Sequence, residues 1–209
     1  KDGEFGVASA TAAPCVGAML PYAAARVGAI ATQAWVNVNL GHHGIRLMRS
    51  GLSAGTALEA LLSEDEGRER RQVIGIGRDS VFGYTGGECT EAKGHVLGKD
   101  FAVAGNILAS RHVLDSMASA FKSSRGELGE RLVRALEAGE RAGGDSRGKV
   151  SAVLLVASPK PKLWHDLRVD MHASPVEELR RIFDAARAEQ EELGDDEDGE
   201  VLRVLPVLE

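Results

Sequence analysis

The chain has 209 residues, of which 44% are hydrophobic and 4% aromatic, and its formal net charge is −6. This length and apolar content are enough for one sizeable core but small for two complete domains. The acidic balance argues against a nucleic-acid-binding protein, because such proteins displace counterions with a basic face. The sequence has neither an apolar run long enough to span a membrane nor a secretory signal peptide, so we expect a cytoplasmic protein.

The first half of the chain alternates short extended segments with short helices. Alternating apolar residues predict strands over 5–9, 27–34, 72–76 and 81–85, of which the last two form a hairpin. A loop that contains Pro14 and Pro21 separates the first two strands. A short helix over 44–50 ends at Gly51, and Ser53 caps the next helix.

The second half carries longer helices and a charged end. Apolar segments predict three more strands, over 101–107, 150–157 and 163–170. Ser110 is expected to cap a helix, an amphipathic helix over 128–136 follows, and Pro175 begins a third helix that runs to about Glu192. We expect residues 1–190 to form one domain. Residues 191–209 are then an acidic linker and a tail whose apolar end could be an edge strand or a docking segment.

The order of these elements indicates the fold class. Strands and helices occur in pairs, which argues against the strict alternation of a parallel doubly wound sheet. Pairs of mostly antiparallel strands with paired helices predict a layered α+β sandwich. Lys1-Asp2-Gly3 has the composition of a turn. If the strand at 5–9 is the second arm of a hairpin, the first arm lies upstream of Lys1.

Residues that often bind metals or act as nucleophiles give little signal. Cys15 and Cys89 are too few for a metal cage, and buried free thiols are a better interpretation than one disulfide. The adjacent His42 and His43 would point roughly 100° apart on a helix, which disfavours one shared ion. The sequence contains neither a GxSxG elbow nor a phosphate-binding loop, and we expect no metal and no cofactor.

Two strand ends carry candidate functional residues. In the GGDSRG segment, Asp145 and Arg147 place opposite charges at the mouth of a strand, where the alternative is a plain turn with a surface ion pair. Asn106 ends an apolar strand, where its amide could donate to a developing oxyanion or simply close a turn.

Six segments together resemble a known family. They are GVASATAAPCVGAMLPYA (6–23), VGAIATQA (27–34), Cys89 with Gly94-His95, Gly105-Asn106, AGGDSRG with SAVLLV (142–156), and DLRVDMH (166–172). In order and spacing, the chain resembles DUF1028, a bacterial and archaeal family of unknown function that is assigned to the N-terminal nucleophile (Ntn) hydrolase superfamily.

The resemblance implies a four-layer αββα sandwich and an amidohydrolase. The nucleophile would be the first residue of the mature chain, a Thr upstream of Lys1. Its α-amino group has a pKa of about 8 and can therefore take the hydroxyl proton at neutral pH. The substrate would be a small or peptide-like amide. Apart from the resemblance, we expect a homo-oligomer, because an Ala/Gly-rich sandwich can pack face to face and oligomers are usually symmetric.

The resemblance also assigns roles to residues. Asp145 would orient the nucleophile and Asn106 would donate to the oxyanion, with assistance from Thr32 and Thr11. Substrate-binding positions would be Gln33, Asn37, Arg147 and Ser151. Either Thr32 or Gln33 would face the pocket, according to strand register. His42 and His43 would begin a solvent-facing helix.

The chain departs from the family pattern at four positions. Family members often have Ser-Lys at Thr11-Ala12, a Trp before Gly94-His95, a Gln at Ala104 and a Gln pair at Lys149-Val150. These differences leave open a second reading, in which the protein keeps the fold but binds a small ligand or acts as an assembly subunit without catalysis.

Overall fold

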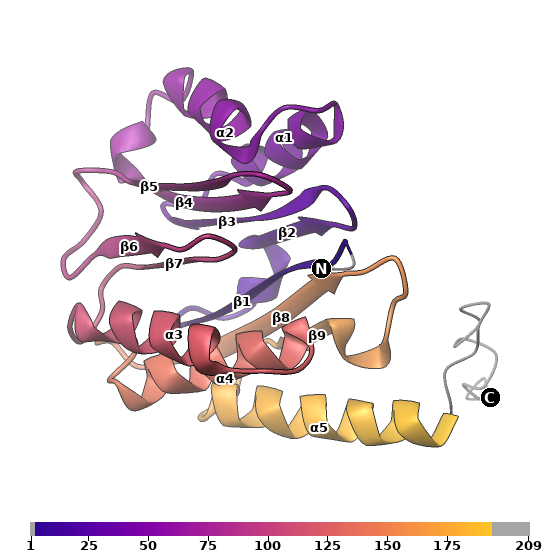
Figure 1. Ribbon diagram of the computed structural model, residues 1–209. Coiled ribbons are helices and arrows are strands. Elements are labelled where there is room, and N and C mark those ends of the chain that lie inside the picture. The colour runs from indigo at the N-terminus through magenta and orange to yellow at the C-terminus, as the bar shows by residue number, and fades with distance from the viewer. Residues whose placement is uncertain (1–2, 194–209) are drawn as a thin grey trace, which may run out of the picture.

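The computed structural model describes residues 3–193, which form a mixed α/β fold with antiparallel sheets and five α-helices (Figure 1). The predicted tail beyond Leu193 therefore lies outside the described residues. All strand pairs within the described range are antiparallel. The prediction of mostly antiparallel sheets is thus confirmed.

The first sheet has four strands and two helices on its outer face. Its order is β2 (Pro21–Ala24), β3 (Gly28–Ala34), β4 (Arg71–Gly77) and β5 (Val81–Thr85). The covering helices are α1 (Val38–Arg49) and α2 (Ala54–Ser63). Ile30, Leu58 and Val73 are fully buried between this sheet and its helices, and the short 3₁₀ helix Arg68–Arg70 leads into β4.

The second sheet has three strands, in the order β1 (Phe5–Thr11), β8 (Ser151–Ala157) and β9 (Asp166–Val169). The covering helices are α4 (Leu128–Arg141) and α5 (Pro175–Leu193), and they enclose Leu154, Leu179 and Phe183. The inner face of this sheet meets the four-stranded sheet, where Val7 and Val153 pack with Ala29 and Ala31.

A separate hairpin completes the described fold. Its strands are β6 (Gly94–Leu97) and β7 (Ala102–Gly105), which pair only with each other. The hairpin lies between the four-stranded sheet and α3 (His112–Ser123), as Figure 1 shows. Val103 of β7 is buried against Leu114 and Phe121 of α3.

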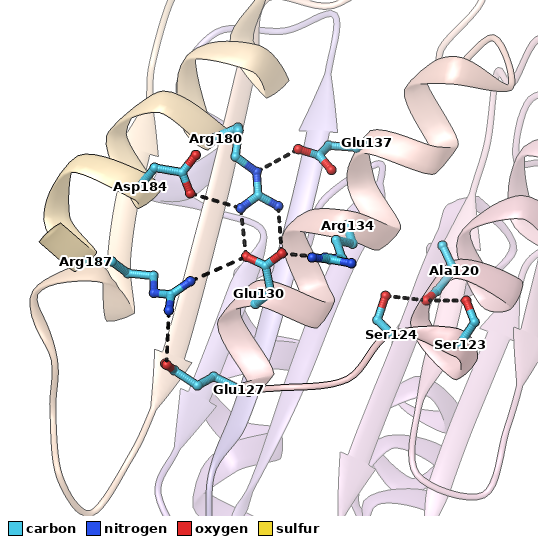
Figure 2. Close-up of polar contacts among 10 residues, drawn as sticks. All are labelled: Ala120, Ser123, Ser124, Glu127, Glu130, Arg134, Glu137, Arg180, Asp184 and Arg187. Atoms are coloured by element: carbon cyan, nitrogen blue, oxygen red, sulfur yellow. Dashed lines mark hydrogen bonds and ion pairs between the residues drawn. The ribbon is translucent and has the colours of Figure 1, made fainter.

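A network of ion pairs attaches α5 to α4 (Figure 2). Arg180 Nη1 donates to Glu130 Oε2 at 2.7 Å, and Arg180 Nε donates to Glu137 Oε1 at 2.7 Å. Burial would raise the pKa of Glu130, but hydrogen bonds from Arg180 and Arg134 outweigh it and hold the pKa below its usual value. Because the Glu130 side chain is only 13% exposed, this network should hold α5 more firmly than a solvated pair would.

The start of α1 corrects one sequence prediction. We expected the helix to begin at Gly44, but it begins at Val38 with Asn37 as N-cap. Gly41 and Gly44 allow the close packing: a Cβ on Gly41 would lie 2.1 Å from Tyr22 Cδ2, and one on Gly44 would lie 2.5 Å from Ile30 Cδ1. Both glycines are thus points of close contact between α1 and the sheet. His42 and His43 are therefore inside α1 and do not begin it.

Other local differences have simple causes. The predicted loop before β3 contains the 3₁₀ helix Val16–Ala18 and strand β2, whose first residue is Pro21, at the edge of its sheet, where proline is tolerated. The predicted strand over 163–170 begins with the 3₁₀ helix Leu163–His165 before β9. Helix α3 begins after Arg111, so Ser110 is not its N-cap. Cys15 and Cys89 are free as expected, but Cys15 is exposed.

Candidate functional site

A cavity of about 2110 Å³ lies in the interior of the fold. Strands β1 and β7 line it along their whole lengths, β3 and β4 contribute residues from the four-stranded sheet, and α3 and α4 contribute apolar side chains. This volume exceeds the roughly 300–1,000 Å³ of ordinary ligand pockets, so the cavity has ample space for a ligand. We therefore take this cavity as the candidate functional site.

One end of the cavity is polar. It is the end at which β1 and β7 both finish, and its lining includes Thr11, Gln33, Asn106, Asp145 and Arg147. An isolated β-bridge between Leu108 and Asp145 joins the segment after β7 to the GGDSRG turn. These five residues come from four separate parts of the chain, and the fold brings them to one end of the cavity.

Asp145 is held in place by its neighbours. Arg147 donates to the carboxylate from Nε at 3.0 Å and from Nη2 at 2.6 Å, and the Arg147 backbone N–H donates to Oδ1 at 2.9 Å. The N–H of Ala12, directly after β1, also bonds to the carboxylate. Burial alone would raise the pKa of Asp145, but these bonds outweigh it and lower the pKa below its usual value. The carboxylate is therefore ionised at neutral pH.

Gln72, near the start of the inner strand β4, connects the polar groups. Its side chain is fully buried. Its Nε2 lies 3.0 Å from the Gly94 carbonyl oxygen and 2.9 Å from the Gly105 carbonyl oxygen. Because backbone carbonyls only accept hydrogen bonds, they fix which end of the Gln72 amide carries the nitrogen. Gln72 Oε1 must therefore point to the opposite side.

The orientation of the Gln72 amide determines the orientation of two other side-chain amides in the cavity wall. Gln72 Oε1 accepts from Gln33 Nε2 at 2.7 Å and from Asn106 Nδ2 at 3.0 Å. Since the nitrogens of both amides face Gln72, Gln33 Oε1 and Asn106 Oδ1 are the acceptors that these side chains can offer to a ligand. Asn106 also retains a second Nδ2 hydrogen for donation.

His95 belongs to the same network. Thr85 Oγ1 lies 3.0 Å from Gln72 Nε2 and 2.9 Å from His95 Nδ1. Gln72 Nε2 has two hydrogens for three oxygens, so Thr85 Oγ1 shares them with the two carbonyl groups, and its own hydroxyl hydrogen is free to donate to His95 Nδ1 in the Nε2–H tautomer. Burial lowers the pKa of His95, and the nearby Arg111 lowers it further. A neutral His95 can accept this hydrogen bond, and it lies in β6.

Three predicted site residues do not face the cavity. Thr32 is fully buried and donates from Oγ1 to the Asn37 carbonyl oxygen, so strand register turns Gln33 to the cavity instead. Ser151 is fully buried, and its Oγ donates to the Ala13 carbonyl oxygen at 2.6 Å. Asn37 caps α1 and donates to Asp65 Oδ2 at 2.8 Å. These side chains bond to neighbouring groups of the protein, and their predicted roles in catalysis and substrate binding stay predictions.

Sequence reasoning missed Gln72, Thr85 and His95 as a connected group. A polar residue in an otherwise apolar strand was the available signal for Gln72, since its neighbours Val73 and Ile74 are apolar. Its partners are distant in sequence, so the signal did not identify them. Within residues 3–193, no group of three or more His, Cys, Asp or Glu could hold a metal ion. In the same range, no helix is both long and apolar enough to cross a membrane.

Comparisons with known proteins agree with this architecture. The model of the DUF1028 family, a family of unknown function, matches residues 1–179. No curated protein gives a significant match. The crystal structure of protein SPO2555 from Silicibacter pomeroyi, a DUF1028 protein, is similar with a TM-score of 0.82 and 31% sequence identity, and the match covers 88% of this chain and 81% of that chain. The chain therefore belongs to the DUF1028 family.

Proposed function

We propose that the protein is an Ntn-type amidohydrolase that cleaves an amide bond in a small or peptide-like substrate. The observation that carries this proposal is the group of acceptors at the polar end of the cavity, where Gln33 Oε1, Asn106 Oδ1 and the Asp145 carboxylate lie close to the end of β1. Acceptors of this kind suit the α-amino group of an N-terminal nucleophile, which is rich in N–H donors. The order of helices, sheet, sheet and helices supports the four-layer αββα sandwich that such enzymes use.

The reaction follows from these roles. The hydroxyl of a mature N-terminal Thr, upstream of Lys1, attacks the amide carbon while its own α-amino group takes the hydroxyl proton. The remaining Nδ2 hydrogen of Asn106 donates to the oxyanion. The C–N bond then breaks, the α-ammonium returns the proton to the leaving amine, and water hydrolyses the acyl ester. Asp145 stabilises the ammonium form through its charge.

The first test is the intact mass and N-terminal sequence of protein purified from its native source. A mature chain that begins with Thr, Ser or Cys upstream of Lys1 is expected. Replacing that residue by Ala should reduce turnover of a reporter amide by at least about 1000-fold. A retained Met, a blocked amine or a start at Lys1 would remove the proposed mechanism.

A matched pair of Asp variants tests the site itself. Asp145 and Asp166 each accept two side-chain hydrogen bonds from the Arg two residues later, but only Asp145 lines the cavity. Asp145→Asn should lower kcat by about 100-fold and leave KM nearly unchanged. Asp166→Asn should leave both constants unchanged. Equal effects of the two substitutions would contradict a role for Asp145 in the reaction.

One observation favours a second function. Arg147 already neutralises Asp145 at close range, and a neutralised carboxylate has less effect on a reacting group than a free one. The alternative is therefore a protein that binds a small amine or amide on the same acceptors without cleaving it. Saturable binding of amides by a protein that turns over none of them would support this alternative.

A further inference from the structure

Trp35 lies where the polar end of the cavity opens to solvent. It lines the cavity and is nevertheless 64% exposed. It follows Gln33 by two positions, so the Cα atoms of the two residues lie at most about 7 Å apart. Met19, which is 51% exposed, also lines the cavity. We call this opening, formed by Met19 and Trp35 beside Gln33, the mouth.

Strand register places Met19 at the same opening. In the antiparallel pair of β2 and β3, the Thr32 N–H donates to the Leu20 carbonyl oxygen at 3.1 Å. Continuing this register by one position sets Met19 opposite Gln33, and opposite residues of such a pair direct their side chains to the same face. The apolar side chains of Met19 and Trp35 therefore flank the amide of Gln33.

The main chain of Trp35 is fixed by a buried ion pair. Its carbonyl oxygen accepts from Arg71 Nη1 at 2.7 Å. Arg71 also donates to the Asp65 carboxylate, from Nε at 2.9 Å and from Nη2 at 3.1 Å. The same carboxylate accepts from Asn37 Nδ2 at 2.8 Å, and the Asp65 side chain is only 8% exposed. Asp65 thus holds both ends of the connection 35–37 between β3 and α1.

The backbone directly before Trp35 is strained. Ala34 has a φ of 64°, which lies in the left-handed region that residues with a side chain rarely adopt. Such conformations persist where the surrounding contacts enforce them, and they are frequent at ligand-binding positions. Single exposed apolar side chains are common, but this one is held on a fixed backbone at the mouth of a cavity. A fixed aromatic side chain loses little conformational entropy when a ligand contacts it.

One face of the Trp35 indole is already covered. The guanidinium carbon of Arg70 lies 5.5 Å from the ring centroid, a distance at which a cation is attracted to the face of the ring. Trp35 lines the cavity and Arg70 does not, so the guanidinium covers the face that is turned away from the cavity. The other face is open to the cavity, where a second aromatic ring can stack on it or pack edge to face.

We propose that the mouth is a binding subsite for an aromatic side chain next to the amide group of the substrate. This proposal rests on the proposed function for the amide itself, whose N–H groups donate to Gln33 Oε1 and Asn106 Oδ1. The carbon atom next to the amide then lies beside these acceptors, and its substituent reaches Met19 and Trp35. Burial of a ring between apolar side chains favours an aromatic substituent over a small one. The substrate class is the amide of an N-acylated aromatic amino acid.

The test is the binding of two neutral amides, N-acetylphenylalaninamide and N-acetylglycinamide, which differ only in the benzyl side chain. Calorimetry gives both dissociation constants, and the phenylalanine amide should bind at least about 10-fold more tightly. The chain contains two tryptophans, and Trp164 is only 5% exposed, so acrylamide quenches mainly Trp35. The phenylalanine amide should protect Trp35 from this quenching. Equal dissociation constants, or the absence of binding, would overturn the proposal.

Substitutions separate contact with the ligand from a structural role. Trp35→Ala should weaken binding of the phenylalanine amide about 10-fold and leave the glycine amide unchanged, whereas Trp35→Phe should retain most of the preference. Met19→Ala should reduce the preference about 3-fold. Met171→Ala is the matched control and should have no effect, because Met171 is 81% exposed and does not line the cavity. Equal weakening of both amides by Trp35→Ala would show a structural role and overturn the proposal.

One more variant and a turnover assay distinguish this proposal from the proposed function. Gln33→Leu should weaken both amides by about 5-fold. If this variant binds the phenylalanine amide as tightly as wild type does, the ring binds Trp35 outside the cavity and the proposal is wrong. If the protein prefers the phenylalanine amide in binding but cleaves neither amide, only the proposed catalysis fails. If it cleaves both amides with equal kcat/KM and binds them equally, only the subsite fails.

Discussion

The two halves of the molecule are packed differently, although both place a sheet against helices. In the half formed by β2–β5, α1 and α2, glycines bring helix and strand so close that Ile30 and Leu58 are fully buried. In the half formed by β1, β7, α3 and α4, Leu128 and Leu132 are only partly buried beside a large cavity. Val133 of α4 is fully buried like Ile30 and Leu58, so the difference is confined to the side chains beside the cavity, which leave apolar surface that a ligand can cover.

A leucine-to-alanine substitution in each half should give the largest difference in the free energy of unfolding. Leu58→Ala in the first half is expected to lower the free energy of unfolding by about 3–5 kcal/mol, because its site is already filled. Leu132→Ala in the second half should cost about 1 kcal/mol in the 209-residue chain, since less contact is lost. Urea unfolding with tryptophan fluorescence measures both values. Equal losses would show that the two halves are packed alike.

Two glycine-to-alanine substitutions test the close packing of the first half. A Cβ on Gly28 would lie 2.2 Å from Met48 Cε and 2.3 Å from the Ile76 carbonyl oxygen. Gly28→Ala should therefore destabilise the protein by about 3 kcal/mol, because the backbone oxygen cannot move aside cheaply. A Cβ on Gly55 meets nothing nearer than 3.8 Å, so Gly55→Ala should add up to about 1 kcal/mol through helix propensity. Thermal unfolding would contradict the interpretation if the two variants shift Tm equally.

Gln72 lies where the two halves meet, and its substitution should have an intermediate effect. Gln72→Leu leaves the Gly94 and Gly105 carbonyl oxygens without this donor and should cost about 2–3 kcal/mol. Gln33→Leu should cost about 1 kcal/mol, because Gln33 is only partly buried. The side-chain amide resonances of Asn106 should shift in both variants, since both alter the network. An unchanged Asn106 amide in Gln72→Leu would show that Gln72 does not orient it.

Acid titration should give the smallest effect. The hydrogen bonds from Arg71 lower the pKa of Asp65 to about 2, from 3.8 in the unfolded chain. Its stabilisation is therefore complete above about pH 4 and is lost as the pH falls through 2, with an amplitude of about 1–2 kcal/mol. Asp65→Asn should remove this part of the acid dependence. If the free energies of unfolding of wild type and variant fall in parallel between pH 4 and 2, Asp65 does not contribute to the acid dependence.

The sequence predicted most of the regular elements of the first half. Periodicity located β4 and β5, and Ser53 marked the start of α2. It did not locate the start of α1, because Gly41 and Gly44 are favourable only where Tyr22 and Ile30 pack against them. Such contacts are tertiary and leave no signal in local propensity.

The candidate site was predicted in part. Asp145 and Asn106 stood out as polar residues at strand ends, and the structure places both in the cavity wall. Thr32 and Gln33 could not be separated, because a one-residue change of register exchanges the faces of a strand. Gln72 was missed because its function depends on the Gly94 and Gly105 carbonyl groups, which reach it only through the hairpin.

These two carbonyl groups determine more than the position of one amide. Neither group can gain or lose a proton near neutral pH, and neither can rotate without moving the β6–β7 hairpin. The two main-chain carbonyl groups thus determine which group donates and which accepts in each hydrogen bond between the hairpin and the cavity. Any amide side chain that reaches Gln72 Oε1 from position 33 or 106 must direct its oxygen to the cavity. The affinity of this end for N–H groups should accordingly persist across the pH range in which the hairpin stays folded.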